Sequence, residues 1–145
     1  MSSTAMNNLL REFGASIGIP DLQIDEEYRC NMMFDDVPVS FELGDGDESM
    51  YIYSLLGHVP DDGLEQFYAE LLHANYAFAD SGGSTLSVDS QSGRVVLLRE
   101  ERLELLRLSR LESVVEQFVN VAEGWMSRLR SGGMNEVEVA AGIAE

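Results

Sequence analysis

Two histidines, one cysteine and a serine-rich loop are the residues of this chain best suited to nucleophilic chemistry. The segment ADSGGS (Ala79–Ser84) could present a nucleophilic serine, which needs a histidine base and an acid that orients the histidine. Only His58 and His73 are available in the whole sequence. We interpret the glycines instead as a helix-to-strand turn, where glycine readily adopts positive φ. The sequence therefore predicts no catalytic residue and no small-molecule substrate, that is, a protein that is not an enzyme.

Acidic residues in DGDES (Asp45–Ser49) could hold calcium. A calcium loop of the EF-hand type needs alternating ligands, a central glycine and a distal glutamate between two helices, and this segment lies between predicted strands. His58, His73 and Cys30 do not form a set with metal-ligand spacing. Cys30 falls on the apolar side of a predicted strand, which favours a buried, inert thiol. We expect no metal, no cofactor and, because no phosphate-binding glycine loop is present, no ATP-dependent step.

The charge of the chain excludes several classes of partner. Its formal net charge is −17, with 45% hydrophobic residues, so it is acidic but rich enough in apolar residues to fold. Residues 1–93 contain only two arginines against 17 acidic residues, and the chain has no lysine. Such a surface repels nucleic acid and anionic membranes and is compatible with a basic or amphipathic protein partner. Solubility alone is an equally good explanation of the charge.

The expected location is a reducing, cytosolic compartment. No apolar run approaches the roughly 18 residues that a membrane span needs. The N-terminal segment MSSTAMNN has neither a basic region nor an apolar core like that of a secretory signal. A single cysteine cannot form an internal disulfide, which suits a reducing compartment.

The hydrophobic pattern predicts one helix followed by three strands. The first helix, about Ala5–Ile17, has apolar residues at helical spacing and ends before Gly18 and Pro20. Alternating residues then predict strands at Tyr28–Phe34, Val37–Leu43 and Met50–Leu56. Short connections between them favour an antiparallel meander.

The second half of the chain adds a helix, two strands and a long helix. These are expected at Leu64–Asn75, around Leu86 and Val88, at Val95–Leu98, and at about Ser109–Leu129. The resulting fold class is α+β, a twisted antiparallel sheet with three helices in the order α-β-β-β-α-β-β-α. We expect residues 1–130 to form a single domain and residues 131–145 to form a flexible C-terminal tail.

Four segments carry a resemblance to a known family. They are LLREFGASIGIPDLQID, FYAELLHANY, LSVDSQSGRVVLLRE and VEQFVNVAEGWMSRL. In their order, and in the length and acidity of the chain, they resemble the class I type III secretion chaperones, the Tir-chaperone-like family. The resemblance covers about residues 5–130. It implies an ATP-independent homodimer that holds the N-terminal segment of a secreted effector in extended form, soluble and competent for secretion.

The resemblance also implies where the partners bind. The effector would lie on the first helix and first three strands, with candidate residues Leu9, Leu10, Phe13, Ile17, Met32, Met33, Phe34, Val39 and Phe41. The dimer interface would use the second helix and the fifth strand, with candidates Leu64, Phe67, Tyr68, Leu71, Val96 and Leu98.

General physics agrees with an effector groove on these elements. A partner strand can pair with an exposed sheet edge, and flexible methionines such as Met32 and Met33 repack around different ligands. Phe13 is expected to be half-exposed and to serve as a binding anchor. Any of these residues could instead be ordinary core. A second interpretation is an acidic inhibitor or immunity-type protein that blocks a basic partner through its carboxylates, and whose binding would weaken in salt.

Overall fold

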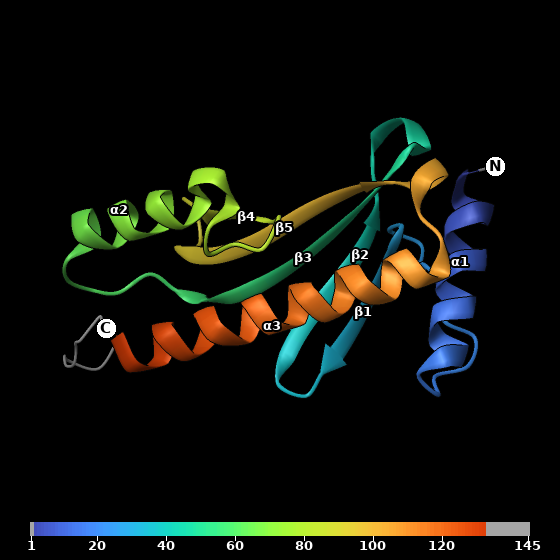
Figure 1. The fold of residues 1–145 in the computed structure, drawn as a ribbon, viewed down its shortest axis with the longest axis horizontal. Helices are drawn as coiled ribbons and strands as arrows, with labels where there is room; N and C mark the ends of the chain where they lie inside the picture. The colour runs from blue at the N-terminus through green and yellow to red at the C-terminus, as the bar shows by residue number, and fades with distance from the viewer. Residues whose placement is uncertain (1, 133–145) are drawn as a thin grey trace.

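The computed structural model describes residues 2–132, and in this part of the chain it contains three helices and one five-stranded sheet (Figure 1). Every neighbouring strand pair is antiparallel, so the predicted α+β class and element order are confirmed. The helices are α1 (Ser2–Ser16), α2 (Leu64–Asn75) and α3 (Leu108–Gly132). The strands are β1 (Arg29–Phe34), β2 (Val37–Leu43), β3 (Ser49–His58), β4 (Thr85–Asp89) and β5 (Arg94–Arg102).

The strands lie in the spatial order β1-β2-β3-β5-β4. β1 and β2 form a hairpin through Asp35 and Asp36, and Asp35 has a φ of 56°, the left-handed conformation that favoured two-residue hairpin turns require. β5 is inserted between β3 and β4 and pairs with the full length of β3. Within the described residues, β1 and β4 are therefore the two edges of the sheet.

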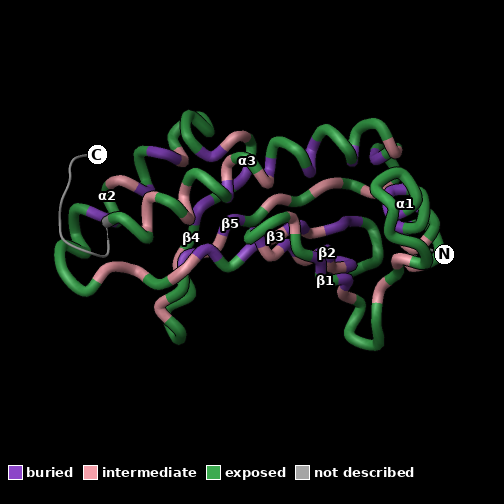
Figure 2. The backbone as a smooth tube through the Cα atoms, turned by 90° about the horizontal axis from the view of Figure 1, so that it is seen from below, coloured by how far each residue is buried: buried purple, intermediate pink, exposed green. Residues whose placement is uncertain are grey.

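One face of the sheet, which we call the inner face, is packed against α3 (Figure 2). Alternate strand residues point into this layer, as the period of a strand dictates. The buried strand residues include Val37, Val39, Phe41, Met50, Ile52, Val95 and Leu97. The residues of α3 at helical spacing that meet them are Leu111, Val114, Val115, Phe118 and Ala122. The opposite, outer face carries apolar side chains that stay partly exposed, among them Tyr53, Leu55, Val96 and Leu98.

Several elements are longer than the sequence pattern predicts, and α1 begins earlier, at Ser2. β3 extends to His58, and β5 runs past the predicted end at Leu98 to Arg102. In β5, Arg99 and Glu101 continue the inner face with charged side chains, so the apolar alternation stops before the strand does. α3 continues past the predicted end at Leu129 to Gly132. The predicted tail 131–145 thus begins inside this helix, and its residues from 133 onward lie outside the described part of the chain.

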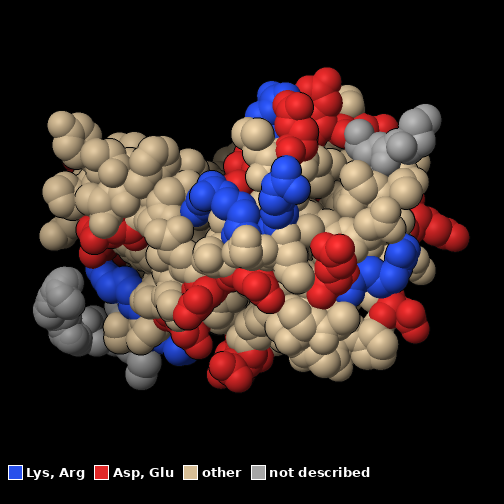
Figure 3. Space-filling model, turned by 45° about the vertical axis from the view of Figure 1, so that its right-hand side comes forward, with Lys and Arg blue, Asp and Glu red and all other residues tan. Residues whose placement is uncertain are grey.

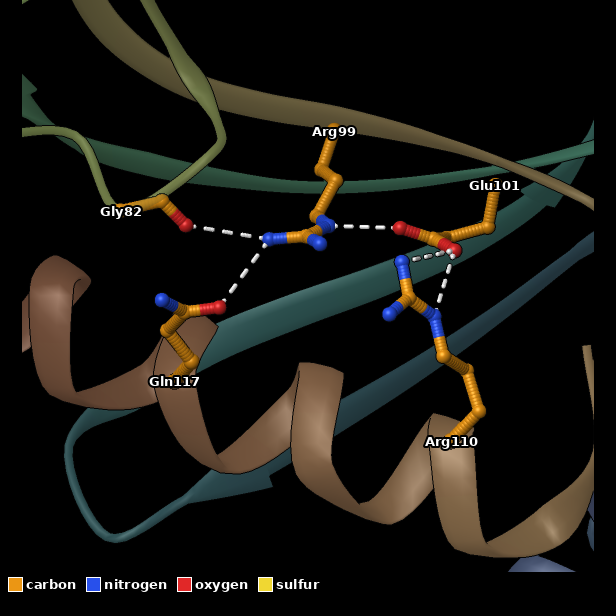
Figure 4. Close-up of polar contacts among 5 residues, drawn as sticks. All are labelled: Gly82, Arg99, Glu101, Arg110 and Gln117. Atoms are coloured by element: carbon orange, nitrogen blue, oxygen red, sulfur yellow. Dashed lines mark hydrogen bonds and ion pairs between the residues drawn. The ribbon is translucent and has the colours of Figure 1, made fainter. Parts of the chain in front are cut away.

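Arg99 holds the loop after α2 against β5 and α3 (Figure 4). Its Nη1 donates to the carbonyl oxygen of Gly82 at 3.0 Å and to Oε1 of Gln117 on α3 at 3.3 Å. Its Nε donates to Oε2 of Glu101 at 2.7 Å, and the other oxygen of Glu101 accepts from Arg110. One guanidinium therefore connects the loop, the fifth strand and the third helix, which fixes the position of α2 relative to the sheet.

The predicted helix-to-strand turn in ADSGGS is confirmed. Gly82 and Gly83 have φ values of 60° and 87°, a region that residues with a Cβ rarely adopt. A Cβ on Gly82 would also lie 2.7 Å from Cγ2 of Val121, so this glycine lets the loop approach α3 closely. The loop is a structural connection between α2 and β4.

Candidate partner-binding surfaces

The outer edge of β1 offers backbone groups to a partner strand. Asp25 occupies the start of this edge: its backbone N–H donates to the carbonyl of Arg29 at 2.7 Å, and its Oδ1 accepts from the Arg29 N–H at 3.1 Å. Because backbone groups alternate between the two sides of an antiparallel strand, those of Asn31 and Met33 point to the same edge. No other strand of residues 2–132 pairs with it. The open section of β1 is therefore Asn31–Met33.

The predicted effector-binding residues separate into core and surface. The buried ones are Leu9, Leu10, Phe13, Met32, Val39 and Phe41. Phe34 is half-buried and packs against the same core, while Ile17 and Met33 are exposed. Met33, with 63% of its surface exposed, stands beside the open edge of β1. An effector role for the nine residues stays a prediction, and the exposed pair is the part that a partner can reach without rearrangement.

The expectation that Phe13 is half-exposed is wrong. Only 2% of its surface is accessible, and its ring packs against Phe34 and Phe41 with centroid distances of 6.4 Å and 6.1 Å. Such tilted and edge-on contacts are the favoured arrangements of aromatic pairs. Phe13 is buried because Phe34 of β1 and Phe41 of β2 both point to the inner face opposite α1, and α1 packs on their rings.

The predicted dimer residues also divide. Phe67 and Leu71 of α2 are buried in the chain's own core, and Val96 of β5 is half-buried. Leu64, Tyr68 and Leu98 are exposed to between a third and a half of their surface. Their assignment to an interface stays a prediction.

The sequence reasoning missed the most exposed apolar residues near α2. Leu72, Tyr76 and Phe78 lie at and just beyond its C-terminal end and are all exposed. Phe78 and the preceding Ala77 have positive φ values of 56° and 52°, which costs free energy for residues other than glycine. The only sequence signal for this exposed surface is the pair of aromatic residues after the helix. From the sequence alone they resemble buried core residues, because the turn after Asn75 cannot be foreseen.

An open groove of about 560 Å³ separates α2 from the second half of α3. Polar contacts connect its two walls. Arg128 of α3 donates to both carboxylate oxygens of Glu70 on α2, at 3.1 Å and 2.8 Å. The indole Nε1 of Trp125 donates to the carbonyl of Asp80 at 2.9 Å. These contacts attach α2 to α3 beside the groove.

The residues considered first for chemistry are not gathered into one site. Cys30 is buried on the inner face of β1, and burial raises the pKa of its thiol, with the Asp25 carboxylate as a smaller cause. His58 ends β3 and His73 lies on α2, both exposed. In the described residues, no three His, Cys, Asp or Glu side chains lie close enough to hold a metal ion. Each helix of residues 2–132 is too short or too polar to cross a membrane.

Comparison with known proteins places this geometry in a family. Residues 8–126 match the model of the Tir chaperone protein (CesT) family. Tir chaperones of Escherichia coli O157:H7 and of Citrobacter freundii are each 29% identical over 126 residues, which is 87% of this chain and 80% of theirs.

Solved structures share the fold over nearly the whole chain. A chain in the crystal structure of the ExsC–ExsE complex superimposes with a TM-score of 0.75 and 25% identity, covering 88% of this chain and 95% of that one. A chain of the HopA1–SchA chaperone–effector complex gives a TM-score of 0.69 with 21% identity, covering 90% and 96%. The match to the family model extends from the middle of α1 into α3 and includes the whole sheet. The chain belongs to the Tir chaperone protein (CesT) family.

Proposed function

We propose that this protein is an ATP-independent chaperone that binds the N-terminal segment of a type III secreted effector in extended form. In the complex, the effector stays soluble and competent for secretion. Family membership supports the class of function, as does the likeness to a chaperone–effector complex. The observation that carries the binding mode is the open section of β1, Asn31–Met33, beside the exposed Met33 side chain. An extended segment can pair there through its backbone and lay alternate side chains against the sheet.

The same proposal includes no catalytic step and a location in the bacterial cytoplasm. The support is that the relatives are chaperones of bacteria, named for the protein they serve. Binding of an extended segment by strand addition needs neither a nucleophile nor a nucleotide, because backbone hydrogen bonds and apolar burial supply the free energy.

Replacing Met33 by proline tests the binding mode directly. The N–H of Met33 points to the open edge, and proline removes this donor while being tolerated on edge strands. We expect Met33→Pro to keep the fold and to bind the effector segment about tenfold more weakly, since a strand-addition hydrogen bond and its neighbours are lost. The measurement is calorimetric titration with the N-terminal segment of a secreted protein that co-purifies with this chain.

Met33→Ala is the matched control, because it removes the side chain and keeps the N–H. Equal binding by the parent and Met33→Pro would contradict strand addition at β1. Failure of the parent to bind the segment at all would contradict the proposed chaperone function.

The acidic-inhibitor interpretation makes a different prediction for salt. On the face drawn in Figure 3, acidic side chains form small groups separated by arginines and uncharged surface. Binding through apolar side chains and backbone pairing should persist when added salt shortens the range of charge interactions, whereas binding through carboxylates should weaken steeply. Repeating the titration at high salt separates the two interpretations.

We also propose that the protein is a homodimer that uses the exposed side of α2. Tyr68 and Leu72 lie one turn apart on this helix and are both exposed. We expect light scattering at micromolar concentration to give the mass of two chains for the parent. For Tyr68→Glu/Leu72→Glu we expect the mass of one chain, because buried charges would oppose association. Leu105→Glu, at a residue as exposed as Leu72 but located after β5, is the control and should stay dimeric. A parent of single-chain mass would contradict the proposal.

A further inference from the structure

The other edge of the sheet is closed by a side chain. The carboxamide of Asn75, the last residue of α2, lies against β4. Its Nδ2 donates to the carbonyl of Leu86 at 2.9 Å, and its Oδ1 accepts from the Leu86 N–H at 2.8 Å. These are the two hydrogen bonds that a residue of a neighbouring strand would make in an antiparallel pair. Asn75 therefore occupies the place of a partner strand at Leu86, the second residue of β4.

Other features of β4 do little to prevent strand addition. Natural edge strands are protected by charged side chains, proline, bulges or a covering element. β4 has the sequence TLSVD, with one charge at its end, and it pairs with β5 in an unbroken register from Thr85↔Leu98 to Asp89↔Arg94. Its outward groups at Leu86 are the ones that Asn75 takes. By alternation, the groups of Val88 are the outward pair that remains beyond this contact.

The two edges thus differ in a way that selects between them. On β1 the side chain and backbone of Asp25 close only the first outward position, Arg29, and leave the adjacent outward positions of Asn31 and Met33 open. β4 has only two outward positions, Leu86 and Val88, and Asn75 closes Leu86, so a strand that approaches would find a single open position there. We propose that Asn75 is a specificity-determining residue that closes the β4 edge to strand addition and so directs a partner's extended segment to β1. The direction to β1 rests on the chaperone function proposed above.

A disulfide-trapping experiment tests the closure of β4 without any client. The probe is a synthetic peptide of residues 84–90 with Ser87→Cys, and the protein carries Ser87→Cys and Cys30→Ser. If the peptide pairs antiparallel with the outward groups of Leu86 and Val88, the two residues at position 87 face each other as a non-hydrogen-bonded pair. Their Cα atoms then lie about 4.5 Å apart, which a disulfide can bridge.

With Asn75 present we expect little trapped peptide. Asn75→Ala should raise the trapped fraction about tenfold, because two backbone hydrogen bonds become available to the peptide. Faster hydrogen exchange of the Leu86 amide would verify that the edge has opened. Asn8→Ala, at an exposed position of α1, is the matched control and should trap like the parent. If Asn75→Ala is too unstable to assay, Asn75→Ser removes the same two contacts and should likewise raise the trapped fraction.

Equal trapping with and without Asn75, whether low or high, would overturn the proposal. A low, equal value would mean that the body of α2 blocks β4, and a high, equal value would mean that nothing does. Because the probe is a peptide of this chain, either result leaves the chaperone proposal to be decided by the titration of Met33→Pro. Conversely, if the parent fails to bind effector, the trapping result still shows whether Asn75 closes the β4 edge.

Discussion

Phe13→Ala is expected to lower the free energy of unfolding by about 3–5 kcal/mol, the range for removing a fully buried aromatic ring. Phe13 is 2% exposed and contacts the rings of Phe34 and Phe41, so its loss opens a cavity at the junction of α1 and the β1–β2 hairpin. Since single domains are stable by only about 5–15 kcal/mol, this is a large share of the total. Urea denaturation followed by circular dichroism measures the change.

The control for this prediction is Ile17→Ala. Ile17 follows the same helix and is 42% exposed, so its truncation should cost about 1 kcal/mol or less. If the two variants unfolded at the same urea concentration, the aromatic cluster around Phe13 would not be part of the stabilising core. Loss of effector binding in Phe13→Ala alone would not identify an anchor, because unfolding gives the same result.

Arg99→Met is expected to destabilise the protein by about 3 kcal/mol, near the lower end of the range for breaking a buried ion pair by removing one partner. The side chains of Arg99 and Glu101 are only 12% and 10% exposed. Without Arg99, Glu101 keeps Arg110 but loses its shortest contact, and the carbonyl of Gly82 and the amide of Gln117 lose a charged donor. The free energy of unfolding from urea titration is again the measurement.

Arg102→Met is the matched control from the same strand. Arg102 also pairs with glutamates, but its side chain is 55% exposed, and exposed pairs contribute about 1 kcal/mol or less. The double variant Arg99→Met/Glu101→Leu provides a second check. It should be less destabilised than Arg99→Met, because replacing both partners of a buried pair by apolar residues removes the uncompensated charge. If Arg99→Met and Arg102→Met were equally stable, the network in Figure 4 would not stabilise the loop.

The fold class followed from patterns that act locally. The alternation of Val37, Val39 and Phe41 and the helical spacing of Leu111, Val115 and Phe118 each mark one apolar face of an element, and both faces are buried in the structure. The α2 boundaries at Leu64 and Asn75 agree with the prediction because glycine precedes the helix and a sharp turn follows it. Periodicity of this kind depends on neighbours within a few turns, which is why one sequence suffices to recognise it.

The division between groove and core did not follow from the sequence. Phe13 and Ile17 belong to the same apolar stripe, yet Phe13 is buried and Ile17 is exposed. Only Phe13 packs against the aromatic rings of β1 and β2. Asn75 reads as an ordinary helix-end residue until β4 is placed beside it. Arg99 lies in a strand whose pattern suggests surface charge, and its burial depends on a loop and a helix distant in sequence. Contacts of this kind are set by tertiary structure.

The insertion of β5 between β3 and β4 has a consequence for synthesis of the chain. Ser49 pairs with Arg102, so β3 gains its second neighbour only after most of the protein has left the ribosome. At translation speeds of about 5–20 residues per second, the second edge of β3 therefore stays unpaired, and its apolar side chains stay uncovered, for seconds. α3, which covers the inner face, emerges later still. A nascent chaperone therefore passes through an interval in which it exposes an open edge and apolar surface of its own, before it can protect those of a client.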